Sequence, residues 1–156
     1  MKKATAHYDM LDKLKEVLEA DLNVNTVSYG NIYDAANNTT TVWPLSHFTV
    51  NSVDMTKQTF RFNMTLFCMD LINSSKDLAE DDFVGNDNVK DIHNTQLAVI
   101  SKATLLFARR DMVMAGFNLV GDPKFEAFAH EFNQHDVAGW YCDFSVEVIQ
   151  SMGVGC

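Results

Sequence analysis

The sequence lacks the features of a zinc site, a membrane span or a secretion signal. Its three cysteines, Cys68, Cys142 and Cys156, form no CxxC pair and no Cys/His spacing typical of zinc ligands. No apolar run approaches the roughly 18 residues of a membrane span. The first residues lack the apolar core of a signal peptide. We therefore expect a protein made in a reducing cytoplasm, with no membrane partner and no metal.

Basic residues are also scarce. Lys and Arg number 12 against 21 Asp and Glu, and the formal net charge is −9. A basic footprint of the kind that grips nucleic acid is absent overall. Ordinary solubility is enough to explain such a charge. The second interpretation is a surface that lets DNA slide past without binding, because like charges repel.

The sequence contains no recognisable catalytic motif. His93 has no Ser or Cys nucleophile placed beside it by a known pattern. The acidic segment 73–87 lacks the spacing of a calcium loop, so a solvated loop is favoured over a metal site. Adjacent carboxylates such as Asp81 and Asp82 rarely share a catalytic site. The residues therefore predict neither an enzyme nor a cofactor.

Apolar residues are plentiful. The chain is 47% hydrophobic and 11% aromatic, with eleven Phe and eight Met among 156 residues. This content predicts a Phe-rich core with Met filling gaps, and the alternative is that some of these side chains line a subunit interface. No repeat or linker is visible, so we expect one domain over residues 1–156, with residues 151–156 as a flexible tail.

The longest helical pattern runs from Asn86 to Arg110. Its apolar residues recur with a period of about 3.6 residues. Asp87 can cap its first turn, and Arg109 and Arg110 suit its negative C-terminal end. A shorter amphipathic helix is predicted over Thr5–Ala20.

Strand patterns lie on both sides of the long helix. Clean alternation of apolar and polar residues marks Lys57–Leu71 and Trp140–Ile149 as half-buried strands. Weaker patterns occupy Val24–Tyr33, Val42–Val53 and part of Gly116–Phe128. The strands either side of residues 54–57 should form an antiparallel hairpin. The order predicts an α+β fold, with an antiparallel or mixed sheet of four to five strands, a long helix packed on one face and a short N-terminal helix.

Several short segments carry a resemblance to a known family. They are Trp43-Pro44-Leu45, Phe83–Asn88, Asn94–Ala98, Gly121-Asp122-Pro123 and Ala138-Gly139-Trp140. Over Val27–Val148 the chain resembles small virion proteins of tailed phages. Its size and element order are similar to lambda-type tail terminator and tail-completion proteins. The ending Ser151–Cys156 departs from the more polar or proline-containing segment expected of such relatives, which leaves open what these last residues contact.

The resemblance implies a non-enzymatic virion structural protein that forms a homo-oligomeric ring, expected as a hexamer. The ring would lie at the head-proximal end of the tail, end polymerisation of the tail tube protein and dock the head connector or neck protein. DNA would pass through the lumen without specific binding. The alternatives are another neck, tail-tube or head-completion protein, and a small enzyme or ligand-binding α+β domain. The last of these predicts a closed apolar pocket with converging polar groups.

A ring repeats one heterologous interface around a closed axis, and that interface needs exposed loops and strand edges. Pro44 cannot donate a ladder hydrogen bond, so the start of its strand should be an edge or a bulge. We expect the first half of the long helix to border a partner contact, while the half from Leu97 onward fills the core. The candidate interface residues are Asp34, Asn37, Asn38, Trp43, Pro44, Asp81, Asp82, Asp87 and His93.

Overall fold

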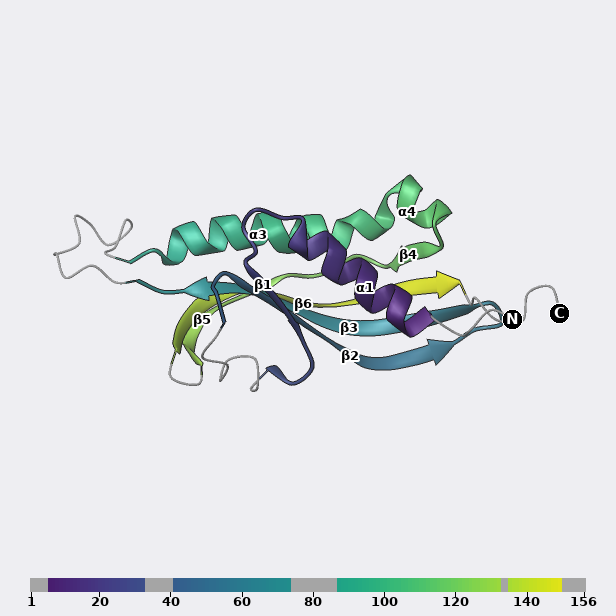
Figure 1. Cartoon of the computed structure of the whole chain (residues 1–156), viewed down its shortest axis with the longest axis horizontal. Coiled ribbons are helices and arrows are strands. Elements are labelled where there is room, and N and C mark those ends of the chain that lie inside the picture. The colour runs from purple at the N-terminus through teal and green to yellow at the C-terminus, as the bar shows by residue number, and fades with distance from the viewer. Residues whose placement is uncertain (1–5, 33–40, 74–86, 133–134, 150–156) are drawn as a thin grey trace.

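The computed structural model describes residues 6–32, 41–73, 87–132 and 135–149, which form a mixed six-stranded sheet with helices on one face (Figure 1). The helices are α1 (Ala6–Glu19), α3 (Val89–Leu105), the 3₁₀ turn η1 (Leu106–Ala108) and α4 (Arg110–Met114). The strands are β1 (Thr26–Tyr29), β2 (Leu45–Met55), β3 (Thr59–Leu71), β4 (Phe117–Val120), β5 (Glu126–Phe132) and β6 (His135–Ile149). The predicted α+β fold, with its long helix on a mixed sheet and its short N-terminal helix, is confirmed.

The sheet is built on three long antiparallel strands, β2, β3 and β6. The predicted hairpin of β2 and β3 is present. On the outer side of β2 lies β1, which pairs with it in parallel. On the outer side of β6 lie both β4, opposite Ser145–Val148, and β5, opposite His135–Tyr141. The lateral edges of the sheet are therefore β1 and β2 on one side and β4 and β5 on the other.

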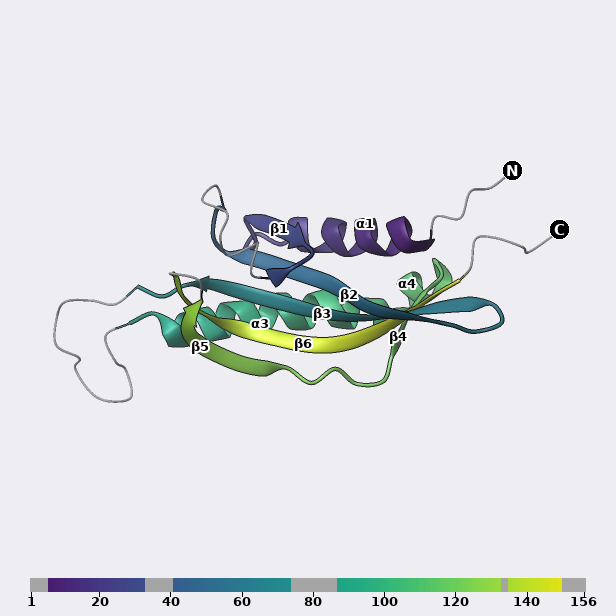
Figure 2. The same cartoon turned by 90° about the horizontal axis from the view of Figure 1, so that it is seen from below.

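One large core lies between the sheet and the two longer helices. The apolar half of the alternation in β3 and β6 supplies its sheet side, as the sequence predicts. Figure 2 shows the sheet with α3 behind it and α1 beside β1 and β2. Ile100 and Phe107, which the helical pattern assigns to the core, are fully buried. The core includes Met10, Leu14, Leu18, Phe62, Met64, Leu66, Cys68, Val99, Ile100, Ala103, Phe107, Cys142, Phe144, Val146 and Val148.

The long helix is shorter than its sequence pattern. After η1 the backbone of Arg109 is extended, with φ −72° and ψ 148°. Arg110 then begins α4, so the expectation that both arginines lie at the C-terminal end of the long helix is wrong. The break between η1 and α4 lets side chains on both sides of it reach the core. Phe107 and Met112 would point about 140° apart on a straight helix, yet both reach the core here.

None of α1, α3 and α4 covers the opposite face of the sheet, which we call the helix-free face, although the helical residue Ile32 packs at one end of it. A small second cluster of Leu45, Met69 and Val137 covers one end of it, and the partly buried side chains of Trp43 and Phe128 pack against this cluster. The rest of this face carries mainly polar side chains.

Candidate assembly interface

Some of the predicted interface residues cannot be placed. Asp34, Asn37 and Asn38 fall in residues 33–40, and Asp81 and Asp82 fall in residues 74–86, which lie outside the described part of the chain. Their predicted role in assembly stays a prediction.

Trp43 and Pro44 hold the first two strands together within the subunit. They are joined by a cis peptide bond, and both are partly buried. The Trp43 carbonyl accepts a hydrogen bond from Asn25 Nδ2 at 2.7 Å. The Pro44 carbonyl accepts from the main-chain N–H groups of Asn25 at 2.9 Å and Thr26 at 3.2 Å. Because Leu45 at the start of β2 pairs with both β1 and β3 in regular register, the expectation of an edge or a bulge there is wrong.

Asp87 and its neighbour fix the start of α3. The carboxylate of exposed Asp87 accepts a hydrogen bond from the N–H of Val89, the first residue of α3, at 3.1 Å. The N-cap residue is Asn88 rather than the predicted Asp87, and its side chain makes no capping hydrogen bond. Asn88 accepts from the Asn73 N–H at 2.7 Å and donates to the Leu71 carbonyl at 3.3 Å. The helix therefore begins against the end of β3, with Asp87 on the surface beside it.

His93 joins α3 to the far edge of the sheet. Its Nε2 lies 3.0 Å from the carbonyl oxygen of Phe128 in β5. Its own carbonyl accepts a hydrogen bond from Trp140 Nε1 at 2.8 Å, and the two rings meet edge to face with their centroids 5.5 Å apart. These contacts give His93 a structural role inside the subunit. Its predicted role in assembly is untested.

The helix-free face carries a hydrogen-bonded network that sequence reasoning missed. We call it the polar lattice: Asn51, Ser52, Asp54, Arg61, Asn63, Thr65, Asp143, Ser145 and Glu147. Asn63 Nδ2 lies within hydrogen-bonding distance of Ser52 Oγ at 3.0 Å and of Asp54 Oδ2 at 2.9 Å. Ser145 donates to the amide oxygen of Asn63 at 2.6 Å. The signal was present in the polar half of the strand alternation, which identifies an exposed face but not its cross-strand partners.

Three further contacts extend the polar lattice between β2, β3 and β6. Arg61 pairs with Glu147, with Nη2 3.0 Å from Oε1. Thr65 donates to the Asp143 carboxylate at 2.5 Å and accepts from Asn51 Nδ2 at 2.8 Å. The lattice thus presents the carboxylates of Asp54, Asp143 and Glu147 against the single guanidinium of Arg61. This face is acidic, as the net charge of the whole chain would suggest.

Beside the lattice, an aromatic group meets the carboxylate of Glu126, which also pairs with Lys124 at 3.8 Å. The Tyr141 hydroxyl donates to the Glu126 carboxylate, and this hydrogen bond raises the pKa of Tyr141 above its usual range. The Tyr141 ring stacks on Phe67 with centroids 5.6 Å apart, and Phe67 also meets Phe128 at 6.3 Å. The face therefore passes from apolar and aromatic at one end to acidic and polar at the other.

The outer edge of β2 is open over most of its length. The pairing with β1 ends at Phe48, and beyond it no described strand pairs with the outer side of Thr49–Met55. A bulge interrupts the ladder to β3 between Val50 and Ser52. Residues 51–58 are all exposed, and the tip of the hairpin extends past the helices (Figure 2).

His47 in β2 attaches β1 to the first part of β2, where the edge of β2 is covered. The ring is buried between β1 and β3, with Nδ1 2.7 Å from Ser28 Oγ and Nε2 2.7 Å from the Gly30 carbonyl oxygen. A carbonyl can only accept, so Nε2 carries the proton and Ser28 donates to Nδ1. Burial lowers the pKa of His47, and the bond to Gly30 opposes this in part.

Two of the cavities on the described surface bear on assembly. One of about 550 Å³ lies on the helix-free face and is lined by Gly30, Asn31, Ile32, Thr49, Thr65 and Phe67. It has no charged lining residue, and its Thr65 hydroxyl is engaged by Asp143. The other, of about 220 Å³, lies between the start of α1 and the β2–β3 hairpin. It is lined by Ala6, His7, Val53, Phe60 and Phe62.

Neither a metal centre nor a spanning helix is found in the described ranges. No group of three or more His, Cys, Asp or Glu residues among them is placed to hold a metal ion. None of their helices is long and apolar enough to cross a membrane. Cys68 and Cys142 are buried as free thiols in the core, and burial raises the pKa of each to about 12.

Comparison with known proteins adds no relative: no protein-family model and no curated protein matches the chain.

Proposed function

We propose that this chain is a virion structural protein, a tail terminator whose copies form a ring at the head-proximal end of a phage tail tube. The observation that supports this is the open edge of β2 beside the acidic polar lattice. The unpaired backbone groups of a long strand edge can pair with a strand of another chain, and here the edge also exposes Val53 and Met55. Natural proteins usually cover such an edge or interrupt it. In the proposed ring, a neighbouring subunit covers the open edge of β2 and so prevents it from pairing with other chains.

The polar lattice also has a role in the proposed ring. Antiparallel sheets can leave one face to solvent, and here that face is acidic and internally hydrogen-bonded rather than apolar. In the proposed ring it lines the lumen. Its carboxylates repel the phosphate backbone, so DNA passes without binding. The ring needs no cofactor and performs no chemistry, and its partners are the tube protein below and the head connector above.

The direct test is assembly of tail tubes with and without this chain. Purified tube protein should form tubes of uncontrolled length alone, and shorter tubes capped by a ring when this chain is added, as seen by negative-stain electron microscopy. Particles made without the chain should likewise show overlong tubes or filled heads without tails. Normal virions in its absence would contradict the proposal.

The same experiment separates the alternative virion roles. A tube protein would itself polymerise into long tubes, whereas a terminator stops at one ring. A head-completion protein would bind the portal end of filled heads and leave tube length unchanged. Either result would contradict the terminator role and assign the chain to that other role.

A further inference from the structure

We infer that neighbouring copies join head to tail, with α4 of one copy seated on the apolar surface between α1 and β2 of the next. This inference rests on the proposed self-assembly, but not on where in the virion the ring lies. It is carried by two exposed apolar patches on this chain.

The first patch, which we call the α1–β2 patch, surrounds the smaller cavity. Val53 and Phe60 line that cavity together with His7, whose ring stacks on Phe62 at 6.1 Å. Met55, at the open edge of β2, is 75% exposed, and Tyr8 on α1 is also exposed. A hollow with an apolar lining, rimmed by exposed apolar side chains, is a surface that another protein covers.

The second patch, which we call the α4 patch, consists of Val113, Met114 and Ile149. Met114 is 78% exposed, although α4 is a short helix with only Met112 turned into the core. Ile149 lies beside it, because its N–H donates to the Gly116 carbonyl that follows α4, at 3.1 Å. The α4 patch is therefore a protruding apolar group, while the α1–β2 patch is a hollow.

The two patches lie at opposite ends of one row of the sheet. Met55 of β2 pairs with Phe60 of β3, Phe60 with Val148 of β6, and Val148 with Phe117 of β4, the strand that follows α4 after Ala115 and Gly116. Figure 1 shows β2 and α4 at opposite lateral sides of the same end of the molecule. A knob and a hollow on opposite sides of one subunit make a heterologous contact, which closes into a ring when the rotation allows.

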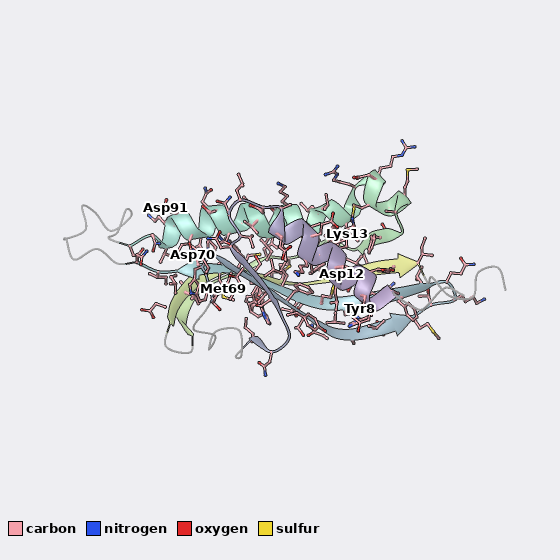
Figure 3. The ribbon with its side chains drawn as sticks, viewed as in Figure 1. Tyr8, Asp12, Lys13, Met69, Asp70 and Asp91 are labelled. Atoms are coloured by element: carbon pink, nitrogen blue, oxygen red, sulfur yellow. The ribbon has the colours of Figure 1, made fainter. Side chains whose placement is uncertain are left out.

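Charge favours the same pairing. Arg110 is exposed at the start of α4. On the other patch, exposed Asp12 lies one turn along α1 from Tyr8. Figure 3 shows Tyr8 and Asp12 on α1, together with Lys13, which pairs with Glu16 at 3.6 Å. Arg109 on the same side of the contact is already paired with Asp111 at 3.2 Å, so Arg110 is the basic group that can meet Asp12 at the rim of the apolar contact and fix the orientation of the partner.

Cysteine cross-linking tests the contact directly. In a Cys156→Ser background, Met55→Cys and Met114→Cys each place one thiol on an exposed side chain, and the core thiols of Cys68 and Cys142 are buried. Under mild oxidation a mixture of the two variants should form disulfide dimers, while either variant alone should not. The double variant should form a ladder that ends at the closed ring. Leu22→Cys, at a position 97% exposed and elsewhere on the surface, is the matched control in place of Met55→Cys.

The outcomes separate this inference from the proposed function. Rings of the unmodified chain without cross-links in the mixture would overturn the α4 contact and leave the terminator role standing. Equal cross-linking of Met114→Cys with itself would indicate a two-fold contact and also overturn it. A chain that stays monomeric at every concentration, even with tail tubes added, would contradict the proposed function and the contact together.

A second variant separates a loss of association from a loss of folding. Met114→Glu places a charge in the contact but leaves the subunit core untouched, because the side chain is exposed. We expect at least a tenfold weaker association with an unchanged melting temperature of the monomer. Leu22→Glu should leave association unchanged. Equal association of the Met114→Glu variant and the unmodified chain would contradict the contact.

Discussion

Gly139 of β6 lies directly against the main chain of Cys68 in β3. A β-carbon at position 139 would be only 2.0 Å from the Cys68 carbonyl oxygen and 2.8 Å from the α-carbon of Met69. Both contacts are with backbone, so no side-chain rotation relieves them. The glycine lets β6 stay close to β3 where it also pairs with β5, and it thereby holds three strands together.

Gly139→Ala should therefore destabilise the fold. Overpacking of a closed site costs about 1–3 kcal/mol, and contact with backbone favours the upper end of that range. Urea unfolding followed by circular dichroism measures the loss. Ala127→Ser, at an exposed position of β5, is the control and should change the free energy of unfolding little. Equal stability of the two variants would show that the strands can move apart without cost.

The end of the long helix offers a matched pair of truncations. Phe107 is fully buried, while Leu105 is about half exposed and only two residues away. Phe107→Ala should lower the free energy of unfolding by about 3–5 kcal/mol, because it leaves a cavity in the core. Leu105→Ala should lower it by well under half as much. Similar losses for both would mean that η1 does not direct Phe107 into the core as described.

The sequence predicted elements whose residues repeat with a clear period. The strand pattern over Lys57–Leu71 becomes β3, and the pattern over Trp140–Ile149 becomes most of β6, because alternation reports burial directly. The break after Leu105 was not predictable in this way. The helical period continues through Leu106 and Phe107, and only packing of the next residues against the core decides that the helix ends.

The candidate site was harder to predict than the fold. Trp43, Pro44 and His93 stood out in the sequence, and the structure gives each of them contacts within the subunit. The α1–β2 and α4 patches were missed, because Met55 and Met114 look like core residues in a Met-rich chain. Exposure depends on which strand lies at an edge, and the strand order arises from contacts that are distant in sequence. No local pattern carries that information.

Acid should weaken the attachment of β1 through His47. Burial lowers the His47 pKa below its usual 6.5, so the folded state favours the neutral ring and the unfolded chain binds the proton more readily. The stabilisation is complete above the unfolded pKa and is lost as the pH falls from about 6.5 through the lower folded value. Stability should therefore decrease with acidification over that window.

The variant His47→Gln isolates this effect from the other histidines. Its free energy of unfolding should be lower than that of the unmodified chain at pH 8, and the gap should narrow between pH 7 and pH 5. Urea titrations at several pH values measure the gap. A gap that widens on acidification would mean that the folded state holds the His47 proton more tightly than the unfolded chain does.

Charge reversal on the polar lattice tests whether this face lines a DNA path. Asp54 and Asp143 are exposed, and each makes its lattice hydrogen bond at the surface. The double variant Asp54→Lys and Asp143→Lys should still fold, because such surface contacts are worth about 1 kcal/mol or less. In assembled rings it should bind duplex DNA at low salt, with an affinity that falls steeply as salt rises.

Glu16→Lys with Glu19→Lys makes the same charge change on α1, on the helical side of the subunit. Fluorescence anisotropy with a labelled duplex compares the two, and we expect at least tenfold tighter binding by the lattice variant. Equal binding by both would show that net charge alone decides the affinity and that the lattice does not face the lumen.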